Sequence, residues 1–178
     1  MAVLDIHLLG SAPLRARSTE VAAIDEATRR FVADLFETMD AAKGVGLAAN
    51  QVGITQRVAV VGVEADRFAM INPVIVSAEG RVRAEEGCLS IPEVYGEVTR
   101  PERVVLEALD ETGQPFRREL DGYVARAVQH EIDHLDGILF FDHLSILKRE
   151  LLLRRWKKEN RGKGVIRKVV PEDDDSTG

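Results

Sequence analysis

The feature that most constrains this chain is the segment H-E-I-D-H at residues 130–134. On a helix, His130 and His134 lie one turn apart and project from the same face. Two neutral imidazoles at this spacing are a pair of metal ligands, and the glutamate between them is a typical general base. The only cysteine, Cys88, is the candidate third ligand, because it has no second cysteine with which to form a disulfide. Three protein ligands leave a fourth position for water or substrate, which predicts a catalytic metal site.

The alternative is a chance motif on a solvated helix, with a cysteine that serves only as a small apolar residue. Apolar residues at helical spacing argue against it, because they predict a helix over residues 122–135 that packs inside the domain and stops at Asp136-Gly137. Imidazoles without partners would be costly there. We therefore favour the metal site. The apolar positions are Ala125, Val128, Ile132 and Leu135.

Two further motifs accompany these residues. Residues 44–51 read G-V-G-L-A-A-N-Q, and residues 86–90 read E-G-C-L-S. In this order and at these separations, the three motifs resemble the signatures of the peptide deformylases of the bacterial type, G-x-G-x-A-A-x-Q, E-G-C-x-S and H-E-x-x-H. The resemblance implies an α+β fold, with small antiparallel sheets around a central metal-binding helix and with a C-terminal helix. It also implies hydrolysis of the N-formyl group from the N-terminal formylmethionine of newly made polypeptides, with release of formate.

The resemblance assigns the metal chemistry to four residues. It implies that Cys88, His130 and His134 hold one divalent metal with a water as the fourth ligand. Glu131 would accept the proton of that water and deliver it to the departing amine. A thiolate and two imidazoles suit several metals; the resemblance favours Fe²⁺, with Zn²⁺, Ni²⁺ or Co²⁺ as the alternatives.

Attack on a formyl carbon places negative charge on the former carbonyl oxygen, which needs hydrogen-bond donors fixed in advance. The resemblance implies that these are the side-chain amide of Gln51 and the backbone N–H of Leu89. Taken alone, Gln51 reads as a residue at the exit of a loop and Leu89 as ordinary core. Glu86 and Arg100 resemble a buried ion pair that supports the cysteine turn; the alternative is a weak pair on the surface.

The glycine-rich loop is too short and wrongly placed for a nucleotide-binding fingerprint. Its backbone groups suit recognition of an extended peptide by strand addition. The resemblance implies an apolar pocket for the methionine side chain, and Arg126 would lie at its rim with its aliphatic stem. For Tyr123, a place in the core is at least as good an interpretation. The candidate substrate-binding residues are Val45, Gly46, Gly87, Tyr123 and Ala127.

A chain of 178 residues that is 45% apolar corresponds to one globular domain. No apolar run reaches the length of about 20 residues that spans a bilayer, and the start has no secretory signal pattern. With one cysteine, we expect a cytoplasmic protein. The predicted parts are a catalytic region at 1–147, a basic helix with its extension at 148–170 and an acidic, disordered tail at 171–178.

Apolar periodicity and turn residues predict the remaining elements. The Asn72-Pro73 pair indicates an edge strand or a break. The expected elements are an amphipathic helix over residues 24–41, strands over residues 58–63, 70–76, 104–109, 116–120 and 139–141, and a last helix over residues 145–158.

Ten basic residues and two acidic ones lie between Lys148 and Lys168, in a chain whose formal net charge is −6. One interpretation is an amphipathic helix with its apolar side on the body and its basic side in solvent. The other, which the resemblance suggests, is docking on ribosomal RNA near the exit of nascent chains, which salt would weaken steeply.

Two other functions use the same residues. A metallopeptidase would take its third ligand from a downstream residue, where His143, Glu150 and Glu159 are available. A non-catalytic metal-binding or ribosome-binding module would require neither Glu131 nor Gln51, so their presence argues against it.

Overall fold

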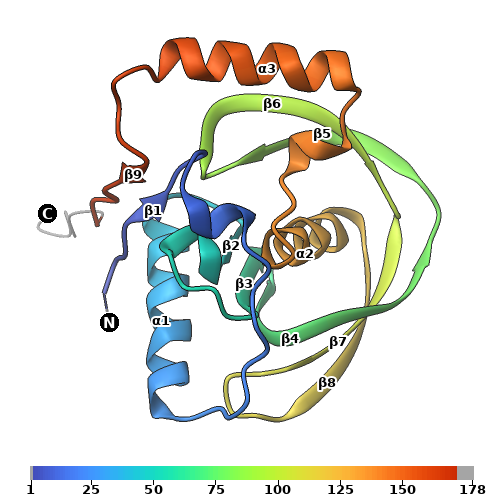
Figure 1. The fold of residues 1–178 in the computed structure, drawn as a ribbon. Helices are drawn as coiled ribbons and strands as arrows, with labels where there is room; N and C mark the ends of the chain where they lie inside the picture. The colour runs from blue at the N-terminus through green and yellow to red at the C-terminus, as the bar shows by residue number, and fades with distance from the viewer. Residues whose placement is uncertain (1, 172–178) are drawn as a thin grey trace, which may run out of the picture.

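The centre of the molecule is a five-stranded antiparallel sheet between two helices, in a computed structural model that describes residues 2–171 (Figure 1). Two smaller two-stranded sheets flank it, so the predicted α+β class with small antiparallel sheets is confirmed. The large sheet has the order β2-β3-β4-β7-β8. Its strands are β2 (Gly46–Ala48), β3 (Val58–Val63), β4 (Asp66–Glu79), β7 (Arg103–Leu109) and β8 (Pro115–Asp121).

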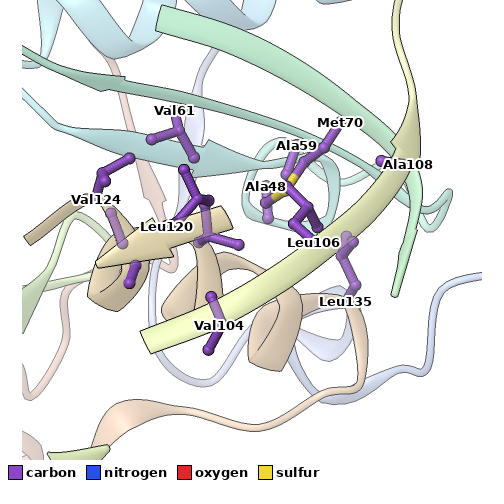
Figure 2. Packing of buried hydrophobic residues seen from close by; sticks show 13 residues of the cluster. Ala48, Ala59, Val61, Met70, Val104, Leu106, Ala108, Leu120, Val124 and Leu135 are labelled. Carbon is purple, nitrogen blue, oxygen red and sulfur yellow. The ribbon is translucent and has the colours of Figure 1, made fainter. Parts of the chain in front are cut away.

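Alternation along β3 builds a core on each face of this sheet. Val58 and Val60 point toward helix α1 (Glu26–Ala41) and pack with its apolar residues. Ala59 and Val61 point to the opposite face and pack on helix α2, as Figure 2 shows for that cluster. β3, whose first four residues are buried, thus contacts both helices, including the one that carries the H-E-I-D-H motif.

The apolar pattern predicts that helix α1 begins at residue 24, but the helix begins at Glu26. Asp25 is the N-cap: its side chain accepts a hydrogen bond from the Thr28 backbone, and Thr28 Oγ1 accepts one from the Asp25 backbone. This capping box satisfies free amides of the first turn and so sets the start of the helix. Ile24 lies outside the helix and still packs against its apolar cluster.

Helix α2 (Gly122–Leu135) has the predicted bounds. Ala125, Val128 and Leu135 are fully buried, so the helix lies inside the molecule as its apolar pattern predicts. Gly137 follows it with φ +76°, a left-handed conformation that glycine adopts without strain. A side chain there would also collide with the backbone of Arg15.

The Asn72-Pro73 pair neither ends β4 nor places it at the edge of the sheet. β4 runs through the pair from Asp66 to Glu79, with a register shift against β7 between Ile71 and Val74. Asn72 adopts φ +51°, and its side chain exchanges hydrogen bonds with the Val21 backbone. Pairing with β3 stops at Ile71, so the missing N–H of Pro73 leaves no sheet hydrogen bond unmade.

The second sheet was not predicted from the sequence. It is a hairpin of β5 (Val82–Cys88) and β6 (Ile91–Arg100), which are paired antiparallel from Val82 and Arg100 onward. β5 has no alternation of apolar and polar residues that would indicate a strand, because its middle holds the charged residues Arg83, Glu85 and Glu86. The hairpin carries both Cys88 and Arg100 at its ends.

Residues 139–141 do not form the predicted strand. Phe140–His143 is a 3-10 helix, η3, whose Asp142 carboxylate accepts a hydrogen bond from the Leu139 backbone 2.9 Å away. Phe140 and Phe141 are buried all the same, against β6 and the last helix. An apolar run of this length indicates burial but does not distinguish a strand from a helical turn.

The last helix, α3 (Ile146–Glu159), has nearly the predicted bounds. After it, β9 (Ile166–Arg167) pairs with β1 (Ile6–His7), so the chain returns to its own start (Figure 1). The boundary expected at residue 147 stays a prediction, and the acidic tail lies outside the described residues except for Pro171. Within residues 2–171, no helix has the length and apolar character needed to cross a membrane.

Candidate metal and active site

The three predicted metal ligands converge, although they come from two different elements. Cys88 ends β5, whereas His130 and His134 lie on one face of α2. Their ligand atoms all lie within 4.8 Å of one another. The His134 Nε2 atom is 3.2 Å from Cys88 Sγ and 3.2 Å from His130 Nε2.

This spacing fits one ion held at its centre. Bonds of roughly 2.0–2.3 Å at tetrahedral angles hold ligand atoms about 3.3–3.8 Å apart, close to the distances found here. The buried Nδ1 of His134 has no hydrogen-bond partner within residues 2–171, and its Nε2 faces the other two ligands. A thiolate with two imidazoles, and with no fourth protein ligand in the part of the chain that the structure describes, is the donor set of a catalytic rather than a structural site.

The charges around the histidines also suit a cation. Burial alone lowers the pKa of His130, but hydrogen bonds with Cys88 and Glu86 outweigh it and raise this pKa to about 10. Burial lowers the pKa of His134, and the charge of His130 acts in the same direction. The environment therefore favours one positive charge between the two rings, where a divalent ion would replace the proton.

Glu131 is buried beside this cluster. Burial raises the pKa of its carboxyl group to about 7, against the opposing effect of His130. Its Oε2 atom is buried and has no hydrogen-bond partner among the described residues. A carboxyl group in this state can accept a proton and return it near neutral pH.

Gly46 makes room for Glu131. A Cβ atom at Gly46 would lie 2.6 Å from Glu131 Oε1 and 2.9 Å from its Cγ, so no larger residue fits there without displacing the carboxylate. The sequence analysis gave this glycine only a role in binding peptide backbone. The contact joins the glycine-rich loop to the motif helix.

Gln51 reaches the cluster from the 3-10 helix η2 (Ala49–Val52). Its Oε1 accepts a hydrogen bond from the Ala48 backbone at 2.9 Å, which fixes the orientation of the amide. Its Nε2 donates to Ser90 Oγ at 3.1 Å and points toward Cys88 Sγ at 3.5 Å. Ser90 is a partner that the sequence analysis missed, although it ends the E-G-C-L-S motif.

Leu89 lies between Cys88 and Ser90, is half-buried and lines the cleft in front of the cluster. Its side chain packs with the α1 cluster and against Gly44, where a Cβ atom would lie 2.7 Å from Leu89 Cδ1. The structure thus supports its interpretation as core; the role of its N–H stays a prediction.

Glu86 and Arg100 form a buried pair, so the surface alternative is wrong. Arg100 donates to Glu86 through Nε at 2.6 Å and Nη2 at 2.9 Å, and both side chains are about 95% buried. Glu86 Oε1 also lies 2.8 Å from His130 Nδ1. Burial would raise the pKa of Glu86, but hydrogen bonds from His130 and Arg100 bring it far below its usual range. The resulting carboxylate orients the His130 ring.

Arg126 lines the cleft, as expected, but its guanidinium is not free. The group is buried and donates to Glu86 and to the backbone carbonyls of Val82 and Val98. A carboxylate with two arginines and a histidine around it can stay charged inside the molecule. Arg126 therefore belongs to the support of the metal cluster.

Asp133 of the motif helix is partly buried and takes part in this network. Its Oδ2 accepts from Arg100 Nη1 at 2.8 Å and lies 2.8 Å from His143 Nε2. This contact directs His143 away from the cluster, and the metal-ligand group found within residues 2–171 contains no residue downstream of His134. The arrangement argues against the metallopeptidase alternative.

A cleft of about 380 Å³ opens in front of the cluster. It brings together Cys88, His130, Glu131 and Gln51. Tyr123 is 56% exposed at its edge, so its interpretation as core is wrong. All five candidate substrate-binding residues also line it: Val45, Gly46, Gly87, Tyr123 and Ala127.

One wall of the cleft is a free strand edge. β2 is the first strand of the large sheet and, among residues 2–171, pairs only with β3. The Val45 carbonyl accepts a hydrogen bond from the Gly62 backbone. It is therefore not available to a peptide, contrary to the expectation from the sequence. In an antiparallel pair, successive residues direct their backbone N–H and C=O groups alternately toward the partner strand and away from it. Gly46 therefore presents its N–H and C=O at the open edge.

Comparison with known proteins places the chain in a family. The family model for polypeptide deformylase matches residues 3–150. A peptide deformylase of Alkalilimnicola ehrlichii is 46% identical over 89% of this chain and 91% of its own length. One of Neisseria gonorrhoeae is 46% identical over 90% and 98%, respectively.

The fold agrees with solved structures. A peptide deformylase of Ehrlichia chaffeensis in complex with actinonin is similar with a TM-score of 0.87 and 38% identity, over 90% of this chain and 99% of that one. A Legionella pneumophila structure gives a TM-score of 0.85 and 41% identity over 90% and 96%. The chain therefore belongs to the polypeptide deformylase family, metallohydrolases that remove the N-formyl group from newly made polypeptides.

Proposed function

We propose that Cys88, His130 and His134 hold one divalent metal, and that Glu131, Gln51 and Leu89 act on the formyl group of a peptide bound in the adjacent cleft. The observation that carries this proposal is the convergence of the three ligand atoms within 4.8 Å, beside a buried carboxylate and an oriented amide. Fe²⁺ is the favoured metal, and Zn²⁺, Ni²⁺ or Co²⁺ also suits these ligands.

When bound, a divalent ion would lower the pKa of a water and polarise the formyl oxygen. Glu131 would take a proton from the water whose oxygen attacks the formyl carbon. The amide of Gln51 and the N–H of Leu89 donate to the oxygen that becomes negative. Glu131 then passes the proton to the peptide nitrogen. The carbon–nitrogen bond breaks, and formate and a free amino terminus leave.

The peptide lies extended along the free edge of β2. Gly46 bonds to its backbone on one side, and Gly87 faces it from the hairpin on the other. A Cβ atom at Gly87 would lie 2.8 Å from the ring of Tyr95, which is its cross-strand neighbour. The glycine therefore leaves room for this ring to pack closely at the wall of the cleft. Val45, Tyr123 and Ala127 supply the apolar surface for the methionine side chain.

Formate release tests this function. Anaerobically purified, Fe²⁺-loaded protein should release formate rapidly from N-formyl-Met-Ala-Ser and should not act on N-acetyl-Met-Ala-Ser. A peptide with blocked ends and no formyl group is the control for internal cleavage. Release of new amino termini from that control, with no formate from the first substrate, would contradict the proposal and support the metallopeptidase.

We also infer that the protein works in the cytoplasm, where a lone thiolate ligand stays reduced, and that α3 docks on ribosomal RNA. Trp156 is buried and Leu152 and Leu153 are half-buried against the body. Contrary to expectation, Ile146, Leu147 and Leu151 are exposed, so only part of the apolar side packs on the molecule. Lys148, Arg154, Arg155, Lys157 and Lys158 are exposed beside them.

Co-sedimentation with ribosomes tests the docking of α3. Bound protein should decrease steeply between low and moderate salt. Replacing Arg154 and Lys158 with glutamine should lower the bound fraction at a given salt and leave formate release unchanged. Binding that is independent of salt and of these two residues would contradict the inference.

A further inference from the structure

The segment that follows α3 is built into the frame of the active site. β9 pairs antiparallel with β1, with Arg167 opposite Ile6, and the Val165 carbonyl accepts from the Leu8 backbone. Figure 1 shows the two strands side by side after the long return of the chain. This segment lies beyond residue 150, where the match to the family model ends.

β1 in turn contacts both catalytic loops. It packs against η2, which carries Gln51, and the ring of His7 lies against Gly53. One residue beyond Leu8, the Leu9 N–H donates to the Ser90 carbonyl at 2.9 Å, next to Leu89. The backbone of β9 is therefore held at a fixed place relative to the cleft.

The fixed position of β9 brings Arg167 to the cleft. It lines the same cleft as Cys88 and Glu131, and it is exposed. Within residues 2–171 its guanidinium forms no hydrogen bond or ion pair, whereas the guanidinium of Arg126 in the same cleft is fully engaged by Glu86 and two carbonyls. The cleft thus contains an arginine that has no structural partner among the described residues.

The exposed acidic residues of the cleft come from a different element than Arg167. Glu85 and Glu93 line it from the β5–β6 hairpin, whereas Arg167 enters from the β1–β9 side. Glu86 is already neutralised by Arg100 and Arg126. Lys43 also lines the cleft, from the segment between α1 and β2, so the exposed cationic side chains come from other elements than the exposed acidic ones. The preference of the cleft for charge must therefore depend on position along a bound peptide.

We propose that Arg167 binds the carboxylate of an acidic side chain in the peptide substrate, at one position beyond the formylmethionine. A guanidinium forms paired, charge-assisted hydrogen bonds with a carboxylate. Side chains of an extended peptide alternate between two sides, so Arg167 meets one position and not its neighbours. The proposal rests on the proposed function, because it assumes that the formylated peptide lies in this cleft.

Matched peptides test the proposal. N-formyl-Met peptides with a single Glu or Gln at the second, third or fourth position are compared, all with amidated C-termini. At one position, kcat/KM should be about two- to five-fold higher for Glu than for Gln, which is the range expected of a solvent-exposed ion pair. The difference should lie in KM, with kcat unchanged. The preference should shrink as NaCl is raised.

Two variants identify the residue responsible. Arg167→Gln should bring the Glu-to-Gln ratio at that position to one, and Arg167→Glu should reverse it. Lys168→Gln is the matched control, because it removes the same charge from the next residue, which is also exposed and does not line the cleft. It should leave the preference intact. Comparing kcat/KM for a tripeptide with a free C-terminal carboxylate and for its amidated form shows whether a C-terminal carboxylate binds Arg167 in the same way.

Equal rates for Glu and Gln at every position would overturn the proposal, as would a preference that persists in Arg167→Gln or disappears equally in Lys168→Gln. These outcomes differ from a failure of the proposed function. If that function is wrong, no formylated peptide releases formate; if only the role of Arg167 is wrong, the Gln peptides still release it.

Discussion

Glu131→Gln is expected to lower formate release from formylated peptides by about 10²–10⁴-fold, with the metal still bound. The amide has nearly the same shape as the carboxylate, so it keeps the contact with Gly46. It cannot accept a proton. The loss should therefore appear in kcat and in kcat/KM alike, because the interaction belongs to the chemical step rather than to substrate binding.

The control is Glu85→Gln, which removes an exposed carboxylate from the same cleft. It should change kcat by less than about three-fold, since an exposed charge of this kind has a small effect. Metal content and thermal stability are measured for both variants. A Glu131→Gln protein that keeps its metal and works within ten-fold of the wild type would rule out Glu131 as the proton acceptor.

The motif helix was predictable because its signal is local. The spacing of His130 and His134 and the apolar residues on the same helix specify a buried helix that presents two imidazoles. Its end at Asp136-Gly137 is equally local, since a left-handed turn favours glycine. These features need only neighbours within one or two turns.

Other features depend on contacts between distant segments. Gly46 and Glu131 touch although 85 positions separate them, and no pattern within the G-V-G loop indicates that a carboxylate will occupy the space. The binding of Arg126 to Glu86 requires the β5–β6 hairpin, whose first strand has no apolar alternation that would indicate it. Long-range pairing of this kind has no periodicity to detect in a single sequence.

Short apolar runs were ambiguous for a different reason. Residues 139–141 are buried at the N-cap and in the first part of a 3-10 helix and not in a strand, because the Asp142 carboxylate accepts a hydrogen bond from the Leu139 backbone. The pairing of β9 with β1 could not be anticipated either, since each strand has two residues. Arg167 therefore looked like one more charge in a basic extension until the fold placed it at the cleft.

Cys88→Ser is expected to remove the metal. A serine hydroxyl is not ionised at neutral pH, so the site loses its thiolate and retains only two imidazoles. Loss of an outer partner of a ligand already lowers metal affinity by about 10–100-fold, and loss of the ligand itself should exceed that. Competition with a chelator measures the affinity, and formate release should fall with the metal content.

A spectroscopic measurement makes this test specific. Co²⁺-loaded wild type should show near-ultraviolet absorption from thiolate-to-metal charge transfer, and only Cys88 can supply it, because the chain has one cysteine. The band should be absent from Cys88→Ser. His143→Ala is the control: His143 contacts Asp133 rather than the ligand cluster, so this variant should keep both the metal and the band.

The two variants together separate the two kinds of metallohydrolase. A metallopeptidase with a downstream third ligand would keep its metal in Cys88→Ser and lose it in His143→Ala if that ligand were His143. The opposite pattern follows from the geometry found here, in which Cys88 Sγ lies 3.2 Å from His134 Nε2 and His143 is bound to Asp133. Wild-type metal affinity in Cys88→Ser would therefore contradict the ligand set, whatever its effect on formate release.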